Sequence, residues 1–222
     1  MKKLIEHLSK CITDERLELF EKNLNNRTNY ITVVLENIYQ PLNASAVLRS
    51  ADCFGIQGVH VIENYNEFKP DSEIAMGSSN WLTIKRYNQE KNNTIKCIES
   101  LKSEGFRIIA TVPEKNAKEI SSLDLEKGKI ALMFGTELEG LTNDAKEMAD
   151  EFVTIPMYGF TESFNLSVSA AICLYQLRKK LDVSDIKSGL NEDEKDEIML
   201  EWLRYSIDRS EIVEKDFLQN RI

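Results

Sequence analysis

Residues 30–62 read YITVVLENIYQPLNASAVLRSADCFGIQGVHVI, and this stretch decides the expected fold class. Tyr30–Glu36 and Val59–Ile62 are short apolar runs rich in β-branched residues, which are typical of buried strands. Between them, Ala44–Phe54 carries apolar residues at helical spacing, with a proline before it and a glycine after it. The order strand, helix, strand predicts two parallel strands joined by a crossover helix.

The same alternation continues to residue 180. Further strand-like runs lie at Phe106–Val112, Ile130–Phe134 and Phe152–Ile155. Helix-like segments lie at Asn92–Glu104, Thr142–Ala149 and Leu166–Lys180. We therefore expect an α/β domain with a mostly parallel sheet that is covered by helices on both faces.

The two ends of the chain lie outside this alternation. Lys2–Leu24 predicts a charged amphipathic helix, and Asn191–Leu218 predicts one or two acidic helices, joined to the core by a linker at Asp182–Leu190. The expected organisation is an N-terminal helical extension at 1–28, a central domain at 29–181 and a C-terminal helical extension at 182–222.

The composition argues against several classes of protein. The chain has 222 residues, 42% of them hydrophobic, which suffices for one folded unit. Charges interrupt the apolar residues at the N-terminus and no apolar run approaches the roughly 18 residues of a membrane span, so we expect a cytoplasmic protein. The four cysteines stand singly, which predicts reduced, mostly packed thiols and no metal site. The contexts of the two histidines, His7 and His60, favour structural roles.

The net charge of −9 argues against a nucleic-acid partner, because such proteins usually carry an excess of basic residues. The excess of acid is uneven, however. Residues 181–222 carry 12 acidic and 6 basic residues, which leaves room for a local basic face elsewhere on the chain.

A first polar constellation lies on the helix that follows the first strand. A structural interpretation makes Asn43 the N-cap and pairs Arg49 with Asp52 at i+3 on the surface. A functional interpretation is also open, because ligands of open α/β sheets collect beyond the carboxyl ends of strands.

A second constellation, FGTELEGLT at Phe134–Thr142, follows a later strand. Gly135 and Gly140 bracket a tight turn from which Glu137 can project, and no Lys-Ser/Thr pair follows, so the turn is not a Walker A loop. Its backbone could bind an adenine or ribose edge. The alternative is an ordinary strand-to-helix connection with Thr142 as the N-cap.

The third constellation is IPMYGFTESFNLSVSAAICLYQL at Ile155–Leu177. Its small residues predict a helix that approaches another backbone closely, and a polar loop with Ser163 and Asn165 precedes that helix. Capping of a core helix by Ser163 or Asn165 would also explain the pattern.

Together, the three segments resemble in order and spacing the motifs of SpoU-type enzymes, in the SPOUT class of RNA 2′-O-ribose methyltransferases. The matching patterns are Asn43-x5-Arg49, Phe134-Gly135-x-Glu137-x2-Gly140 and Ile155-Pro156-Met157 through Ser163-x-Asn165-x-Ser167-Val168. The resemblance covers about residues 30–180, and GSSNW at Gly77–Trp81 is similar to the TrmH-like tRNA branch.

The resemblance implies a C-terminal deep trefoil knot and a homodimer with the active site at the subunit interface. It implies S-adenosyl-L-methionine as the cofactor, bound in the knot near Thr111, Gly135, Ile155 and Phe164. Phe164 stands where close relatives usually have leucine, so we expect a reshaped adenine pocket with activity retained.

The catalytic positions of the family fall on Asn43, Arg49, Glu137, Ser163 and Asn165. The ribose 2′-hydroxyl must lose its proton as it attacks the activated methyl group. The family gives the arginine the proton-accepting role, aided by a substrate phosphate. Because a guanidinium is essentially always protonated, Arg49 could instead clamp a phosphate or stabilise the developing alkoxide, and both alternatives stay open.

The helical extensions, and the absence of the separate RNA-binding domain of ribosomal-RNA relatives, favour the D-loop guanosine-18 of tRNA as substrate. Ribosomal RNA, the tRNA wobble ribose and a non-catalytic RNA-binding role are the alternatives. Basic residues that could contact phosphates, or simply be solvated, are Arg16, Arg27, Lys85, Arg86, Arg178, Lys179 and Lys180.

Overall fold

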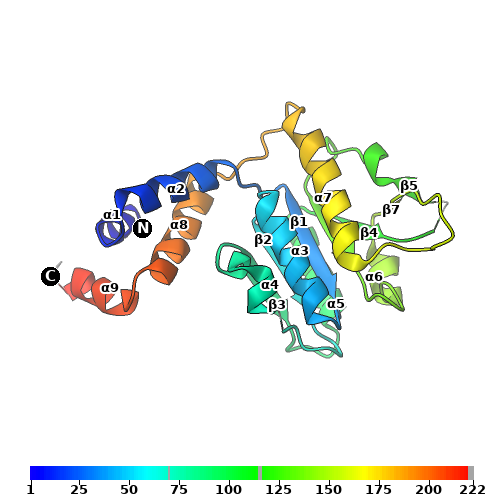
Figure 1. Ribbon diagram of the computed structural model, residues 1–222, viewed down its shortest axis with the longest axis horizontal. Helices are drawn as coiled ribbons and strands as arrows, with labels where there is room; N and C mark the ends of the chain where they lie inside the picture. Colours follow the sequence, from blue (N-terminus) through cyan, green and yellow to red (C-terminus); the bar gives the residue numbers. More distant parts are fainter. Residues whose placement is uncertain (70, 115–116, 220–222) are drawn as a thin grey trace. The chain divides into compact units, whose positions relative to one another are not determined.

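The computed structural model describes residues 1–69, 71–114 and 117–219, which fall into two compact units (Figure 1). One unit is continuous and spans residues 29–188, and the other combines residues 1–28 with 189–222. None of the described helices has both the length and the apolar character that a membrane span requires.

Seven parallel strands form one sheet within the described part of the larger unit, in the order β3-β2-β1-β6-β4-β7-β5. The strands are β1 (Ile31–Glu36), β2 (Gly58–Ile62), β3 (Thr83–Tyr87), β4 (Arg107–Thr111), β5 (Lys118–Glu119), β6 (Ile130–Phe134) and β7 (Glu151–Thr154). In the centre, β1 pairs with β6 so that Val33 lies opposite Leu132. Both strands are buried along their whole length, which accounts for their almost continuous apolar sequences.

Helices cover both faces of this sheet. They are α3 (Pro41–Cys53), α4 (Ser72–Ala75), α5 (Asn93–Ser103), α6 (Asn143–Met148) and α7 (Leu166–Asp182), with 3₁₀ turns η1 (Ser78–Asn80) and η2 (Ile120–Ser122). Val33 and Leu35 of β1 join the apolar cluster that includes α3 and α7, whereas Val34 joins the cluster that includes α5 and α6. The predicted α/β architecture is therefore confirmed.

All five predicted strands and all four predicted core helices form, but the sequence did not reveal β3, β5 and α4. β3 reads TIKRY and lies at one edge of the sheet, where Thr83, Lys85 and Arg86 are exposed, so it lacks an apolar run. β5 and α4 are only two and four residues long, too short for any period to appear.

The smaller unit consists of α1 (Lys2–Ser9), α2 (Asp14–Asn25), α8 (Glu192–Ser206) and α9 (Ser210–Gln219) in the described residues. The single helix predicted for Lys2–Leu24 is wrong, because Thr13 starts a new helix by accepting a hydrogen bond from the Arg16 amide (3.3 Å). The prediction of one or two acidic helices at the other end is confirmed, and two form, α8 and α9. Helices α1 and α2 pack against α8, with the Phe20 ring 5.4 Å from the Trp202 ring.

The strand order creates a switch point between β1 and β6. From β1 the chain passes through α3 to β2, on the side away from β6. From β6 it passes through α6 to β7, which lies beyond β4. Because the two connections leave in opposite directions, a crevice is expected at the carboxyl ends of these strands.

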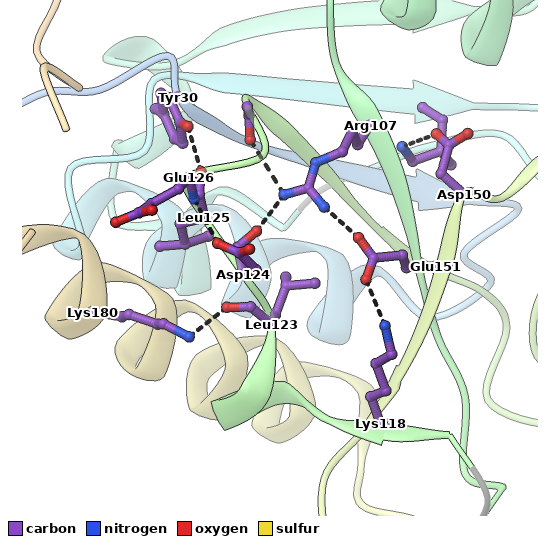
Figure 2. A network of polar contacts seen from close by, with 12 residues as sticks. Tyr30, Arg107, Lys118, Leu123, Asp124, Leu125, Glu126, Asp150, Glu151 and Lys180 are labelled. Atoms are coloured by element: carbon purple, nitrogen blue, oxygen red, sulfur yellow. Dashed lines mark hydrogen bonds and ion pairs between the residues drawn. The ribbon is translucent and has the colours of Figure 1, made fainter.

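On the opposite side of the sheet, where the amino ends of the strands lie, Arg107 organises a polar network (Figure 2). This side is called the amino edge, and the side where the carboxyl ends of the strands lie is called the carboxyl edge. Its Nη1 atom pairs with Glu151, and its Nη2 atom donates to the main-chain oxygen of Asp124 (2.6 Å). Lys118 pairs with the other Glu151 oxygen at 3.1 Å. Arg107 and Glu151 are mostly buried, with 17% and 15% of their side chains exposed.

Two further side chains fix the same connection before β6. Tyr30 donates from its hydroxyl to the Leu125 carbonyl oxygen (2.5 Å), and Lys180 donates to the Leu123 carbonyl oxygen. Burial raises the pKa of Tyr30 and so keeps its hydroxyl protonated as a donor. The amino edge therefore holds backbone carbonyls from one loop, residues 123–128, in place.

Candidate active site

A cavity of about 370 Å³ opens at the carboxyl ends of β4, β6 and β7. Its lining comes from residues 111–114, 134–141, part of 153–157, 162–164, and Leu166, Ser169 and Cys173 of α7. This volume is that of a small-molecule site. The segments that line it include the second and third sequence constellations.

The turn after β6 depends on its two glycines. Thr136 and Gly140 form an antiparallel bridge with both hydrogen bonds at 3.0 Å. A Cβ atom on Gly135 would lie 2.1 Å from the carbonyl carbon of Gly140, and Gly140 has a φ of +71°. Only glycine fits both positions, so the turn keeps Glu137 directed to the cavity rim.

Asn43 connects all three sequence constellations. Its Nδ2 atom donates to Glu137 Oε1 and to Gln40 Oε1 (3.0 Å). Its Oδ1 atom accepts from Asn165 Nδ2 at 3.0 Å. The predicted N-cap role of Asn43 is wrong, because α3 begins at Pro41 after the cap residue Gln40. The asparagine is buried and its amide is fully engaged.

Asn165 has the capping role considered from the sequence and also bonds to α3. It is the N-cap of α7, since its Oδ1 accepts from the Ser167 amide (2.9 Å) and hydroxyl (2.6 Å). Its Nδ2 is the group that donates to Asn43. The same side chain therefore begins α7 and ties that helix to α3.

Arg49 and Ser163 do not belong to the hydrogen-bonded cluster of Asn43, Glu137 and Asn165. Ser163 lines the cavity, whereas Arg49 is exposed on α3 and does not line it. Within residues 1–69, 71–114 and 117–219, neither side chain forms a hydrogen bond or ion pair. The Arg49–Asp52 pair considered from the sequence accordingly does not form among these residues.

The four positions expected near the cofactor, Thr111, Gly135, Ile155 and Phe164, all line the cavity. Thr111 donates from its hydroxyl to the Met133 carbonyl oxygen (2.7 Å), which joins β4 to β6 at the cavity wall. Lining residues that the sequence did not single out include Leu138, Lys146 and Cys173, because they lie between or beyond the motif positions.

A model of the SpoU rRNA methylase family matches residues 30–175. The chain belongs to this family. A tRNA (guanosine(18)-2′-O)-methyltransferase of Borreliella burgdorferi is 42% identical over 212 residues, which cover 96% of this chain and 95% of that protein. The resemblance seen in the sequence motifs is thereby confirmed.

Solved structures share the fold of this SpoU family chain. The A. aeolicus TrmH/SpoU tRNA modifying enzyme matches with a TM-score of 0.78 and 26% identity, over 88% of this chain and 98% of that one. The SpoU methyltransferase AviRb from Streptomyces viridochromogenes, in complex with the cofactor AdoMet, matches with a TM-score of 0.61 and 22% identity. That match covers 73% of this chain and 65% of that one, and it shows the fold alone.

A buried carboxylate that the sequence did not highlight supports the turn from behind. Glu36, 1% exposed at the end of β1, accepts from the Thr142 amide (2.9 Å), the Thr142 hydroxyl (2.7 Å) and the Thr94 hydroxyl (2.5 Å). Thr142 is the N-cap of α6, as predicted, and follows the glycine turn directly. Glu36 therefore holds the end of the loop that carries Glu137.

The histidines and buried cysteines take no part in this site's hydrogen bonding. Burial lowers the pKa of His60 to about 4, and its Nδ1 lies 3.2 Å from the Tyr87 hydroxyl.

Burial raises the pKa of both Cys97 and Cys173 to about 12, so these thiols stay protonated. Cys11 and Cys53 are exposed, so the expectation of packed cysteines holds for only two of the four. The described residues contain no group of three or more His, Cys, Asp or Glu side chains placed to hold a metal ion.

Proposed function

We propose that this SpoU family chain transfers a methyl group from S-adenosyl-L-methionine to a ribose 2′-hydroxyl of RNA, and that the target is guanosine-18 of the tRNA D-loop. The proposed activity rests on one observation, the hydrogen-bonded cluster of Asn43, Glu137 and Asn165 at the rim of the cavity. The substrate assignment is supported by the Borreliella burgdorferi relative, whose similarity extends over both helical ends of this chain.

The cavity suits this cofactor in size and charge. When bound, S-adenosyl-L-methionine supplies an activated methyl group on a cationic sulfonium. Carboxylates in the lining complement such a cation, and they are Glu114, Glu137, Glu139 and Glu162. The Gly135 position, which has no room for a side chain, lets the backbone form the wall. Thr111, Gly135, Ile155 and Phe164 would hold the cofactor from this wall.

Glu137 is the group best placed to orient the ribose. Its Oε1 atom is occupied by Asn43, while its Oε2 atom has no partner in the described part of the chain. A ribose hydroxyl can donate to that free oxygen. Asn43 and Asn165 hold the carboxylate still, so its orientation does not have to be set during the reaction.

Arg49 supplies positive charge from another direction. It lies six residues after Asn43, about 9 Å further along α3 and on a different side of the helix. Because a guanidinium stays protonated, we assign it to binding the substrate phosphate and the developing alkoxide, with the proton passing to phosphate or water. Ser163, at the cavity lining, is assigned to positioning the ribose.

The same proposal includes a homodimer, a trefoil knot in the C-terminal part of the sheet domain and a cytoplasmic location, where tRNA is found. Helices α3 and α7 pack together and expose large apolar side chains: Leu42 (55%), Val168 (45%) and Tyr175 (54%). Pairing of two copies through these helices would cover that surface and bring Arg49 to the site of the partner subunit. Light scattering after size-exclusion chromatography measures the mass directly.

The function is tested with labelled S-adenosyl-L-methionine and unmodified tRNA, followed by mapping of the methyl group. We expect a single label on the ribose of guanosine-18. The matched control is the same tRNA with 2′-deoxyguanosine at that position, which should take no label. Label on ribosomal RNA or on the anticodon loop alone would refute the D-loop assignment, and absence of cofactor binding in calorimetry would favour a non-catalytic role.

A further inference from the structure

The loop between β7 and α7 carries two almost completely exposed aromatic rings. Tyr158 is 94% exposed and Phe160 is 108% exposed. They are separated by Gly159, near whose Cβ position no atom lies within 4 Å. Single exposed apolar residues are common on protein surfaces, but two such rings on one short loop imply a partner.

This loop also forms part of the cavity wall. Ile155 and Met157 line the cavity just before the rings, and Glu162 and Ser163 line it just after them. The loop ends at Asn165, which bonds to Asn43. The two rings therefore lie in the middle of a loop whose flanking residues line the cavity in which the proposed function places the target ribose.

We propose that Tyr158 and Phe160 form the platform on which the target guanine stacks when its ribose enters the site. The inference rests on the proposed function, because the base is attached to the ribose that the proposed function places at the cavity. A base that leaves the stack of a folded RNA loses its stacking free energy unless the protein replaces that interaction. Aromatic side chains replace it well, because every base presents a π-face.

The sequence around the rings favours a base over a protein surface as the partner. Gly159 separates the two rings, and Thr161, Glu162 and Ser163 follow them, so polar and acidic groups lie next to the rings along the loop. A second copy of the chain would need a larger apolar area for stable contact. Isolated rings beside polar and acidic groups match the two faces and the polar edge of a nucleobase.

The decisive experiment is a double-mutant cycle, in which one change removes the two rings from the protein and the other removes the base from the RNA. The double variant Tyr158→Leu/Phe160→Leu keeps apolar side chains and removes both π-faces. Its Kd is compared with that of the wild type for tRNA with guanosine or an abasic ribose at position 18, in the presence of S-adenosylhomocysteine so that no turnover is needed. We expect about 10-fold to 100-fold weaker binding of the guanosine tRNA and unchanged binding of the abasic tRNA.

Two controls isolate the effect. Tyr65→Leu removes another exposed ring (83%) that lies outside the loop between β7 and α7, and it should leave both affinities unchanged. Tyr158→Phe/Phe160→Tyr keeps both rings and should bind like the wild type. Calorimetry with S-adenosyl-L-methionine should give the same affinity for all variants.

Equal loss of affinity for both RNAs, or no loss for either, would overturn the proposal. A change of oligomeric mass in the Leu variant would overturn it in favour of a second copy of the chain as partner. A wild type that methylates no guanosine-18 would remove the proposed function, and this inference with it, whereas normal methylation with an unaffected Leu variant removes the inference alone.

Discussion

The amino edge and the carboxyl edge of the sheet, which are formed by the two ends of its parallel strands, both carry polar networks. The two networks are built differently. At the amino edge, Arg107, Tyr30 and Lys180 donate to main-chain oxygens of the connection before β6 (Figure 2). At the carboxyl edge, Asn43 and Glu137 bond side chain to side chain beside the cavity. The first arrangement immobilises backbone, and the second orients groups that still have bonding capacity.

This difference separates stability from chemistry. A buried carbonyl that loses its donor costs free energy of folding. Glu137 Oε2, Arg49 and Ser163 have no protein partner in the described part of the chain, so they are available to substrate. Substitutions at the amino edge should therefore change the free energy of unfolding, and substitutions at the carboxyl side should change the rate of methyl transfer.

The largest effect is expected from Arg49→Ala. Loss of the charge on the phosphate and alkoxide should lower kcat by about 1,000-fold. Because Arg49 is exposed, the unfolding free energy and the affinity for S-adenosyl-L-methionine should not change. Single-turnover methylation and calorimetry measure both, with Lys96→Ala on α5 as an exposed-cation control. Full retained activity would remove Arg49 from the mechanism.

Arg107→Met tests the other edge. It leaves the mostly buried Glu151 without its arginine and should lower the free energy of unfolding by about 3 kcal/mol, measured by urea titration. Lys118→Met is the matched control, because Lys118 pairs with the same carboxylate but is 61% exposed and should cost less than about 1 kcal/mol. Methylation by folded Arg107→Met should be normal. A lowered kcat with unchanged stability would contradict the division between the edges.

Glu137→Gln sharpens the comparison within the site. The amide oxygen can still accept from Asn43, while an NH₂ group replaces the free carboxylate oxygen, so the ribose loses its acceptor. We expect kcat to fall about 100-fold with no change in Tm. Gln40→Ala removes the other acceptor of the Asn43 amide and should have little effect on kcat. If both variants lost activity equally, the orientation of Asn43 would matter more than the Glu137 carboxylate.

His60 gives the smallest expected effect, and it concerns stability alone. Its folded pKa of about 4 lies below the unfolded value near 6.5, so the unfolded chain binds the proton first as the pH falls. Stability should drop by about 2 kcal/mol between pH 7 and pH 5 through this group, and continue to fall toward pH 4. His60→Gln should remove that part of the pH dependence in urea titrations. An identical pH dependence in the variant would assign the effect to other residues.

The sequence predicted the interior of the sheet well, because β1 and β6 are buried on both faces and must be apolar throughout. It missed β3, an edge strand whose Thr83, Lys85 and Arg86 are exposed, so that its sequence has no apolar run. Local pattern also gave Asn165 correctly as one of two possible caps. The local pattern placed the cap of α3 wrongly at Asn43. The residue that actually caps this helix is Gln40, whose side chain forms no capping hydrogen bond.

The motif residues of the site could be named from the sequence, but their bonds could not. Asn43 and Asn165 are 122 positions apart, and only the strand order places their helices together. The Arg107–Glu151 pair was invisible for the same reason, because it depends on the register of β4 against β7. Glu36 reads as the end of an apolar strand, and nothing in its neighbours reveals that Thr94 and Thr142 meet there.

The helical unit formed by residues 1–28 and 189–222 has a consequence for biosynthesis. Helices α1 and α2 leave the ribosome before the sheet domain, yet α8, against which both pack, is made only after the 160 residues from 29 to 188. At roughly 5 to 20 residues per second, that delay is on the order of ten seconds, which is long for an amphipathic segment to expose its apolar face. Helices α1 and α2 must remain in solution or bound to a chaperone until α8 has been made, and a ribosome that stalls inside the sheet domain leaves them without that partner.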